Sequence, residues 1–146
     1  MLFRSTGGTL TGAGKTLKSA RPDLKIIATE PEQAALLSGG DWSPHKIQGW
    51  TPDFIPEVLE KDIADQVIPV NDDESIKTSL ALAKAEGIFV GISAGATVNA
   101  ALKVAETAGP GSVLLAMLPD TAERYLSTPL FAEINEGSDD EWLESL

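Results

Sequence analysis

Cysteine is absent from this chain of 146 residues. Its absence excludes disulfide bonds, metal sites built on thiolates and catalysis by a cysteine nucleophile. Histidine is nearly absent too, because His45 is the only one. The serine of the sequence Gly-Ile-Ser-Ala-Gly, Ser93, superficially resembles the nucleophile of an α/β-hydrolase, but His45 precedes it whereas that fold has its histidine last. The sequence therefore disfavours a serine hydrolase.

Long apolar runs and basic residues are also scarce. No apolar run reaches the roughly 20 residues that span a bilayer, and the apolar start of the chain is too short for a secretory signal. Lysine and arginine number 11 against 22 aspartates and glutamates, which gives a formal net charge of −11. Because this charge repels phosphate backbones, we do not expect nucleic acid as a partner. Because neither a spanning segment nor a signal peptide is found, we expect no membrane partner and a cytoplasmic location. No metal site is predicted.

Glycine and proline divide the chain into short segments that alternate between strand and helix patterns. Strands are predicted at 24–30, 65–70, 88–93 and 112–119, with a short one at 45–50. Helices are predicted at 11–20, 32–38, 72–86 and 94–109, with a helical patch inside 54–64. Alternation of helices with almost wholly apolar strands is typical of parallel sheets. We therefore expect an α/β fold with a mostly parallel sheet and helices on both faces.

The clearest predicted helix covers residues 72–86. Asp72 or Asp73 is a suitable N-cap, and acidic residues fill the first turn, where they favour the helix dipole. Gly87 stands where a helix commonly ends in a left-handed residue.

A glycine-rich stretch, Thr6-Gly7-Gly8-Thr9, leads into the first predicted helix. Glycines let backbone N–H groups approach an anion closely, and the helix dipole favours negative charge at that end. The stretch lacks the lysine of a nucleotide P-loop and the spacing of a dinucleotide fingerprint. On the pattern alone, a phosphate site and an ordinary flexible loop both remain open.

A second glycine-rich turn covers residues 90–97, where a predicted strand runs into a predicted helix. The turn places the Ser93 hydroxyl at the carboxyl end of a strand, where open α/β sheets bind ligands. The alternative is a purely structural role, in which Ser93 caps the helix that follows.

Seven stretches of the chain, taken in order, resemble the C-terminal half of the cysteine synthase (O-acetylserine sulfhydrylase) family. They read TGGTLTGAGKTLK, IATEP, LSGG, PHKIQGW..DFIP, DESI, GIFVGISAGA and LPDTAERYLSTPLF. The resemblance implies a pyridoxal 5′-phosphate enzyme with the tryptophan-synthase β-like fold, also called fold type II. The PHKIQG and ERYLST segments favour cysteine synthases over cystathionine synthases and threonine dehydratases.

The resemblance assigns roles to the two glycine-rich turns and to one loop between them. It implies that the cofactor is held by Ser5, Thr6, Gly7, Gly8 and Thr9 at its phosphate and by Ser93 at its pyridine nitrogen. Ser5 stands where the family has glycine. The family's substrate loop corresponds to Gly49, Trp50 and Thr51. In this loop Thr51 and Asp53 replace glycines, which departs from the family pattern.

The implied reaction of the intact enzyme makes L-cysteine and acetate from O-acetyl-L-serine and sulfide by β-replacement. The family also implies a homodimer that can bind serine acetyltransferase. Two alternatives stay open: a related lyase of the cystathionine β-synthase or cysteine desulfhydrase type, and a non-catalytic module that binds phosphate, pyridoxal phosphate or a partner.

The family's Schiff-base lysine lies in a Pro-Ser-x-x-Lys motif upstream of the phosphate loop, and this sequence has no such motif. No catalytic residue is therefore expected in the chain, which we predict to be inactive alone. Residues 1–135 are expected to form a partial cofactor-binding domain, with residues 1–5 a non-native start. Residues 136–146 are expected to form an acidic tail.

Overall fold

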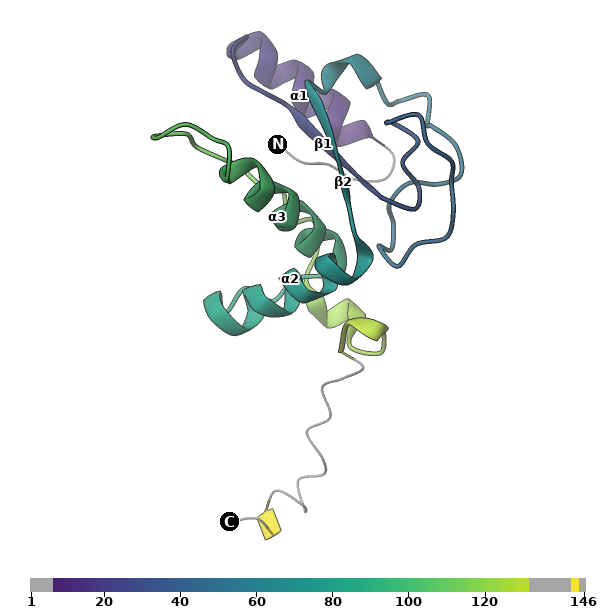
Figure 1. The fold of residues 1–146 in the computed structure, drawn as a ribbon, viewed down its shortest axis with the longest axis vertical. Helices are drawn as coiled ribbons and strands as arrows, with labels where there is room; N and C mark the ends of the chain where they lie inside the picture. Colours follow the sequence, from purple (N-terminus) through teal and green to yellow (C-terminus); the bar gives the residue numbers. More distant parts are fainter. Residues whose placement is uncertain (1–6, 132–142, 145–146) are drawn as a thin grey trace.

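A computed structural model describes residues 7–131, 143 and 144. Its helices and strands are α1 (Gly8–Ala20), β1 (Ile27–Pro31), β2 (Gln66–Val70), α2 (Asp72–Glu86) and α3 (Ile92–Ala105) (Figure 1). Short 3-10 helices are η1 (Lys61–Ile63), η2 (Ala122–Tyr125) and η3 (Pro129–Phe131). Most of the predicted tail, apart from residues 143 and 144, and the predicted non-native start lie outside the described residues.

The two strands form a parallel pair in which Ile27 aligns with Gln66 and Pro31 with Val70. Successive side chains of a strand point to opposite faces of the sheet. Ile27 accordingly belongs to the buried cluster that contains the α3 residues Ile92, Ala96 and Ala100. Ala28 belongs instead to the cluster that contains Leu10 of α1. The prediction of an α/β fold, with helices on both faces of a parallel sheet, is confirmed.

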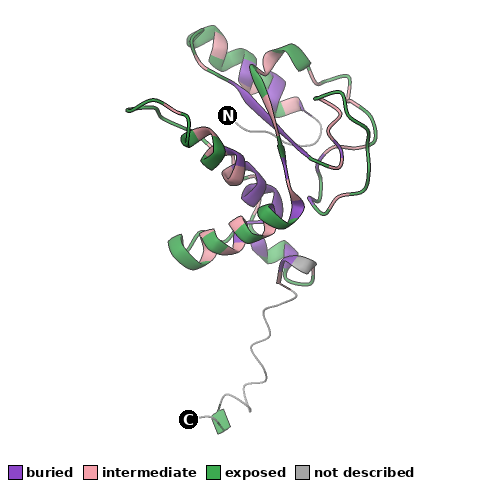
Figure 2. Ribbon diagram, in the orientation of Figure 1, coloured by how far each residue is buried: buried purple, intermediate pink, exposed green. Residues whose placement is uncertain are grey.

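Burial is concentrated where these layers meet. All five residues of β1 are buried, as is the N-terminal half of α3 (Figure 2). Both α1 and α3 run in the opposite direction to β1 and β2 (Figure 1). Their N-termini therefore point toward the carboxyl ends of the strands, which is the edge where α/β sheets hold ligands.

The N-cap of helix α2 lies one residue before the earlier of the two caps that the sequence suggested. The Asn71 side chain accepts hydrogen bonds from the N–H groups of Asp73 (2.9 Å) and Glu74 (3.3 Å), so Asn71 is the N-cap. The prediction of Asp72 or Asp73 as the cap is wrong, because the buried Asp72 carboxylate accepts from the Lys46 N–H instead (2.7 Å). Gly87 does end the helix in the left-handed conformation, with φ of 67°.

Three predicted strands do not form in the described part of the chain. Residues 45–50 make turns, and residues 88–93 contribute one antiparallel bridge, Val90 with Thr121, before α3 starts. Residues 112–119 have no strand partner among the described residues, and Val113 is 93% exposed. An apolar run becomes a strand only when a neighbouring strand satisfies its backbone groups. Composition alone does not supply that neighbour.

Two predicted helical segments are turns because side chains take their backbone donors. In residues 32–38, the Glu30 carboxylate accepts hydrogen bonds from the N–H groups of Leu37 (2.7 Å) and Ser38 (3.0 Å). In residues 54–64, the Thr11 hydroxyl accepts from the Glu60 N–H (3.0 Å), and only the 3-10 helix η1 forms there. Among the described residues, no helix has the length and apolarity needed to cross a membrane.

Asp65 ties α1 to the start of the sheet and makes folding sensitive to acid. Its Oδ2 atom lies 2.8 Å from Nζ of Lys18 and accepts a hydrogen bond from the Ile26 N–H at 2.7 Å. The bond from Lys18 first, and that from Ile26 second, hold the pKa of the Asp65 carboxyl below its usual range. A lowered folded-state pKa stabilises the fold above the unfolded-state pKa of about 3.9, and this stabilisation is lost as the pH falls through the folded value.

We expect Asp65→Asn to lower the free energy of unfolding at pH 7 by about 1 kcal/mol, because a charge-assisted contact is lost from a partly exposed site. The deficit should shrink as the pH falls below about 4, because the unfolded-state carboxyl of the wild type is protonated first and the folded-state carboxyl follows at lower pH. Urea denaturation at pH 7 and pH 3 measures both effects. Asp23→Asn is the control, because Asp23 and its partner Arg21 are 77% and 69% exposed. An equal effect of the two substitutions would contradict the prediction.

Candidate functional site

The N-terminus of α1 is an open helix end. Gly7 is its N-cap, with φ of 72°, and the Thr11 N–H donates to the Gly7 carbonyl at 2.8 Å. Among the described residues, no side chain caps this end, and its first turn contains no acidic residue. The first N–H groups of a helix have no partner within the helix. The end therefore presents the partial positive charge and free donors that bind anions.

Gly7 is required at this cap for two reasons. Its positive φ is costly for any residue with a Cβ atom. A Cβ placed there would also lie only 2.5 Å from Cδ1 of Leu59. Gly7 is buried, Gly8 is half-buried and Thr9 is exposed, so the open end lies between the core and the surface. Ser5 and Thr6, which the sequence placed at the same phosphate, lie outside the described residues.

A cavity of about 40 Å³ lies beside this helix end. Its lining joins α1, β1 and the loop after residue 49 and comprises Gly7, Leu10, Ala28, Thr29, Leu36, Leu37, Trp50, Thr51, Pro52, Phe54, Ile55, Pro56 and Leu59. Two buried polar atoms of these residues, Oγ1 of Thr29 and Nε1 of Trp50, have no hydrogen-bond partner among the described residues. The structure thus brings Gly7 together with Trp50 and Thr51, which the sequence assigned to the phosphate site and the substrate loop.

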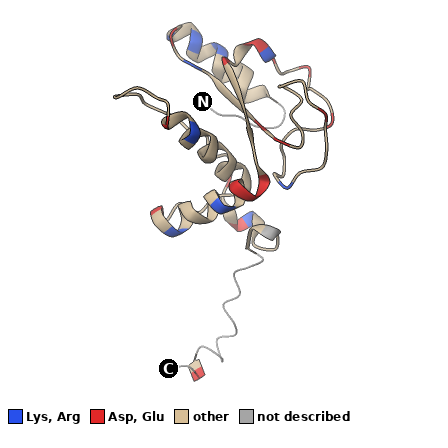
Figure 3. Cartoon of the chain, in the orientation of Figure 1, with Lys and Arg blue, Asp and Glu red and all other residues tan. Residues whose placement is uncertain are grey.

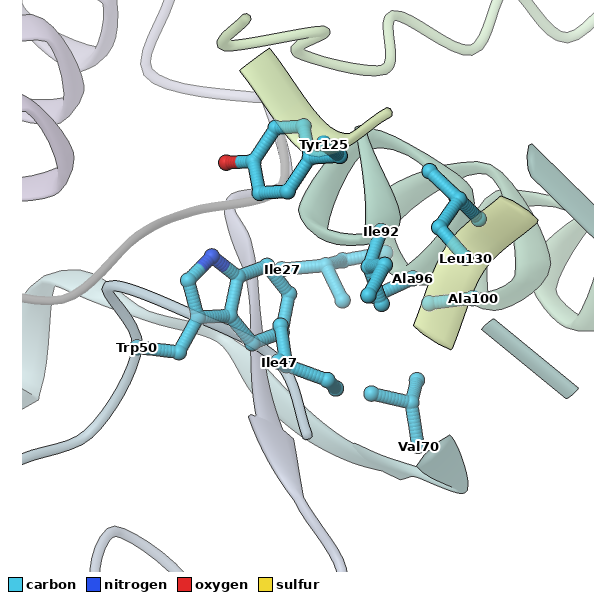
Figure 4. Packing of buried hydrophobic residues seen from close by; sticks show 9 residues of the cluster. All are labelled: Ile27, Ile47, Trp50, Val70, Ile92, Ala96, Ala100, Tyr125 and Leu130. Carbon is cyan, nitrogen blue, oxygen red and sulfur yellow. The ribbon is translucent and has the colours of Figure 1, made fainter. Parts of the chain in front are cut away.

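The predicted substrate loop is firmly anchored. Trp50 is 5% exposed and packs in the main core with Ile27, Ile92 and Tyr125 (Figure 4). The Thr51 carbonyl accepts a hydrogen bond from Nε1 of Trp42 at 3.0 Å. Gly49 and Thr51 both adopt positive φ, 76° and 31°. Gly49 retains the conformational freedom that this turn needs, whereas Thr51 adopts a positive φ without being a glycine.

Ser93 lies in the first turn of α3 and is 2% exposed. The helix N-cap is Gly91, so the alternative in which Ser93 is the cap is wrong. The Ser93 hydroxyl donates to Oδ1 of Asp120 at 3.3 Å, and the Tyr125 hydroxyl donates to Oδ2 of the same carboxylate. Ser93 does not line the cavity beside Gly7, but the adjacent Ile92 shares the core cluster with Trp50 and Tyr125 (Figure 4).

The sequence did not indicate that Asp120 and Tyr125 form a hydrogen-bonded group with Ser93. Both lie in the stretch LPDTAERYLSTPLF, which served only to recognise the resemblance. Thr29 was missed as well, and no signal in the sequence marks it.

Acidic side chains gather on the first turn of α2 and leave the start of α1 without any (Figure 3).

These residues fit a phosphorylated aromatic cofactor. The open α1 end suits a phosphate, and the unpartnered Thr29 and Trp50 atoms offer polar contacts beside it. The buried Ser93 hydroxyl suits a polar ring atom. The Lys46 ammonium is paired with a carboxylate of α2, because its Nζ atom lies 2.9 Å from Oδ1 of Asp73. The hydrogen bond between them raises the pKa of Lys46 and lowers the pKa of the Asp73 carboxyl.

Comparison with known families agrees with this chemistry. Residues 4–120 match the family described as "Pyridoxal-phosphate dependent enzyme". The chain is 56% identical over 141 residues to the O-ureido-L-serine synthase of Streptomyces lavendulae, covering 97% of this chain and 44% of that protein. It is 47% identical over 127 residues to the cysteine synthase of Staphylococcus aureus (strain N315), covering 87% of this chain and 41% of that protein.

Solved structures show the same likeness. A crystal structure of an O-ureido-L-serine synthase mutant with O-ureido-L-serine bound superposes with a TM-score of 0.91 and 54% identity, over 99% of this chain and 45% of that one. The O-acetylserine sulfhydrylase isoform 3 of Entamoeba histolytica superposes with a TM-score of 0.85 and 37% identity, over 99% and 43% of the two chains. The chain thus spans less than half the length of each of these relatives.

Proposed function

Because this chain belongs to the family of pyridoxal-phosphate dependent enzymes, we propose that it forms the cofactor-holding part of a cysteine synthase. The proposed reaction converts O-acetyl-L-serine and sulfide to L-cysteine and acetate by replacing the substituent on the β-carbon. The observation that carries the proposal is the open N-terminus of α1 at Gly7, which faces a cavity shared with Trp50 and Thr51. For the whole protein we expect a homodimer, with serine acetyltransferase as a candidate partner.

In this proposal the residues of the chain bind and orient, while the cofactor, when bound, supplies the electron sink. The N–H groups of Gly8 and Thr9 would hold the phosphate dianion, and the dipole of α1 would stabilise its charge. Ser93 would contact the pyridine nitrogen through its hydroxyl. The family's lysine has no matching motif in this sequence, so the proposal gives this chain no covalent step.

A second candidate reaction differs in the nucleophile. The chain is 56% identical to an O-ureido-L-serine synthase, and Thr51 and Asp53 stand where the resemblance to cysteine synthases calls for glycines. Formation of O-ureido-L-serine by β-replacement requires the hydroxyl oxygen of hydroxyurea as the nucleophile in place of sulfide. The substrate loop, in which Thr51 lines the cavity, is where we expect the two activities to differ.

We expect Thr9→Glu to weaken the binding of pyridoxal 5′-phosphate to the purified chain by about tenfold or more, equivalent to about 1.4 kcal/mol. A carboxylate in the first turn repels the phosphate, yet it favours the helix dipole and should stabilise the fold by about 0.3–1 kcal/mol. Absorbance titration measures binding, and thermal denaturation measures the stability. Loss of binding without loss of stability would separate the site from the fold.

Thr16→Glu is the matched control, since it adds the same charge to an exposed position two turns further along α1. Its cofactor affinity should stay within about twofold of wild type, because dipole effects fall off beyond the first turn. Pyridoxal without its phosphate should bind at least tenfold more weakly, by the same argument. Equal affinities for the two compounds, or equal effects of the two glutamates, would refute a phosphate site at this helix end.

The nucleophile is tested by joining this chain to the amino-terminal part of the S. lavendulae O-ureido-L-serine synthase, in place of the region it matches. The hybrid is given O-acetyl-L-serine with equal sulfide and hydroxyurea, and the products are identified by mass spectrometry. L-cysteine as the main product supports the first proposal, and O-ureido-L-serine supports the second. A hybrid that binds the cofactor but forms neither product would favour a non-catalytic module.

A further inference from the structure

Asp120 gathers three contacts at the start of α3. Its Oδ1 atom accepts from the Ser93 hydroxyl at 3.3 Å, and its Oδ2 atom accepts from the Tyr125 hydroxyl. Its backbone carbonyl accepts from the Gly91 N–H at 3.4 Å. The carboxylate therefore joins the segment before η2, the end of η2 and the first turn of α3.

The packing around Gly91 holds this carboxylate in place. A Cβ at Gly91 would lie 2.5 Å from Cε2 of Tyr125 and 2.8 Å from Oδ1 of Asp120. Tyr125 is 8% exposed and Ser93 2% exposed, so little water competes for these bonds. Gly91 thus allows a close approach that any larger residue would prevent.

The contact fixes the direction of the Ser93 hydrogen bond. A carboxylate has no proton to give, so the single hydroxyl proton of Ser93 is directed to Asp120. A serine hydroxyl that has used its proton offers only lone pairs to a further partner. Among the described residues, no other group takes the Ser93 proton.

We propose that Asp120 is a positioning residue that makes the Ser93 hydroxyl an acceptor toward the cofactor's pyridine nitrogen, so that the nitrogen is held in its protonated form. This inference rests on the proposed function, in which Ser93 contacts that nitrogen. It differs from the simple expectation for a neutral serine, which would donate its proton and leave the nitrogen unprotonated. In the proposed arrangement, the Asp120 carboxylate acts on the pyridine nitrogen through the Ser93 hydroxyl.

The test follows the ¹⁵N signal of pyridoxal 5′-phosphate labelled at its pyridine nitrogen and bound to the purified chain. In wild type we expect the chemical shift of a protonated nitrogen. In Asp120→Asn the amide NH₂ can donate to Ser93, which frees the serine proton, and the signal should move toward the shift of an unprotonated nitrogen. Tyr125→Phe is the control, because it keeps Oδ1 of Asp120 as the acceptor, and its signal should stay near wild type.

A readout without cofactor tests the contact itself. The thermal midpoints of Ser93→Ala, Asp120→Asn and the double variant should be non-additive, because the two residues share one hydrogen bond. If Asp120→Asn fails to fold, Asp120→Ser takes its place, with the same direction expected for the nitrogen signal. Additive midpoints would overturn the inference.

The outcomes separate this inference from the proposed function. If Ser93→Ala changes the ¹⁵N signal and the Asp120 variant does not, the positioning role fails and the proposed site stands. If wild type already shows an unprotonated nitrogen, the inference fails in the same way. If the chain binds no cofactor, or Ser93→Ala leaves the nitrogen signal unchanged, both are overturned.

Discussion

Gly95→Ala is expected to lower the free energy of unfolding by about 3 kcal/mol, near the upper end of typical overpacking effects. Gly95 lies in α3 where that helix crosses α2. An added Cβ would lie 2.1 Å from the Ser75 carbonyl oxygen and 2.8 Å from the Ser79 nitrogen. Both atoms belong to the backbone of α2, so they cannot rotate away as a side-chain end would. The two helices would have to separate, and this disrupts the contacts around them.

Gly12→Ala is the matched control for this substitution. Gly12 is also a helical glycine, in α1, but a Cβ there would meet no atom within 4 Å. Alanine favours helix over glycine by up to about 1 kcal/mol, so this variant should be more stable than wild type. Urea denaturation of wild type and the two variants measures the change in the free energy of unfolding. If the close contact between α2 and α3 controls the effect, this change has opposite signs in Gly95→Ala and Gly12→Ala. A stabilising effect of both alanines would contradict the packing seen at Gly95.

The helix crossing also connects to the candidate site. Ser93 lies one half-turn before Gly95, and the Ser79 hydroxyl donates to the Val90 carbonyl at 2.6 Å, just before α3 begins. Separation of the helices would therefore displace Ser93 relative to Asp120. For this reason we expect Gly95→Ala to weaken cofactor binding as well, and Gly12→Ala to leave it close to wild type.

Local signals in the sequence were sufficient to predict helices α1, α2 and α3 and strands β1 and β2. Gly87 ended α2 where its left-handed conformation requires a glycine, and proline and glycine delimited the other elements. The strand at 112–119 failed for a non-local reason. Its apolar composition indicates burial, but hydrogen-bonded pairing depends on another strand, which the described residues do not provide there.

The candidate site also combines features that local sequence signals indicate with features that depend on distant residues. The glycines before α1 indicated a turn for which a phosphate site and a flexible loop both stayed open, and the positive φ of Gly7 was not predicted. The contact of Asp120 with Ser93 was not predictable, because it joins residues 27 apart in the sequence and depends on how two loops pack. Trp50 was assigned to the substrate loop from the resemblance, and the structure adds that its ring also belongs to the main core.

Glu30→Ala is expected to be similarly destabilising, by about 3 kcal/mol, because it empties a buried site in β1 and removes the acceptor of three hydrogen bonds. Glu30 lies in β1 and is 1% exposed. Its carboxylate accepts from the Leu37 N–H, the Ser38 N–H and the Ser38 hydroxyl, and so folds the turns that replaced the predicted helix at 32–38. Glu30→Gln keeps one acceptor oxygen and should lose about half as much.

Glu30→Ala should also weaken cofactor binding, because the turns that Glu30 holds carry Leu36 and Leu37, which line the cavity with Gly7. Glu32→Ala is the control, because Glu32 is exposed and, within the described part of the chain, its carboxylate accepts one hydrogen bond, from the Asn71 amide at 3.0 Å. It should cost less than about 1 kcal/mol and leave cofactor affinity unchanged. Chemical denaturation and cofactor titration of the three variants test both effects. If Glu30→Ala loses no more stability than Glu32→Ala, the buried carboxylate does not organise the wall of the cavity.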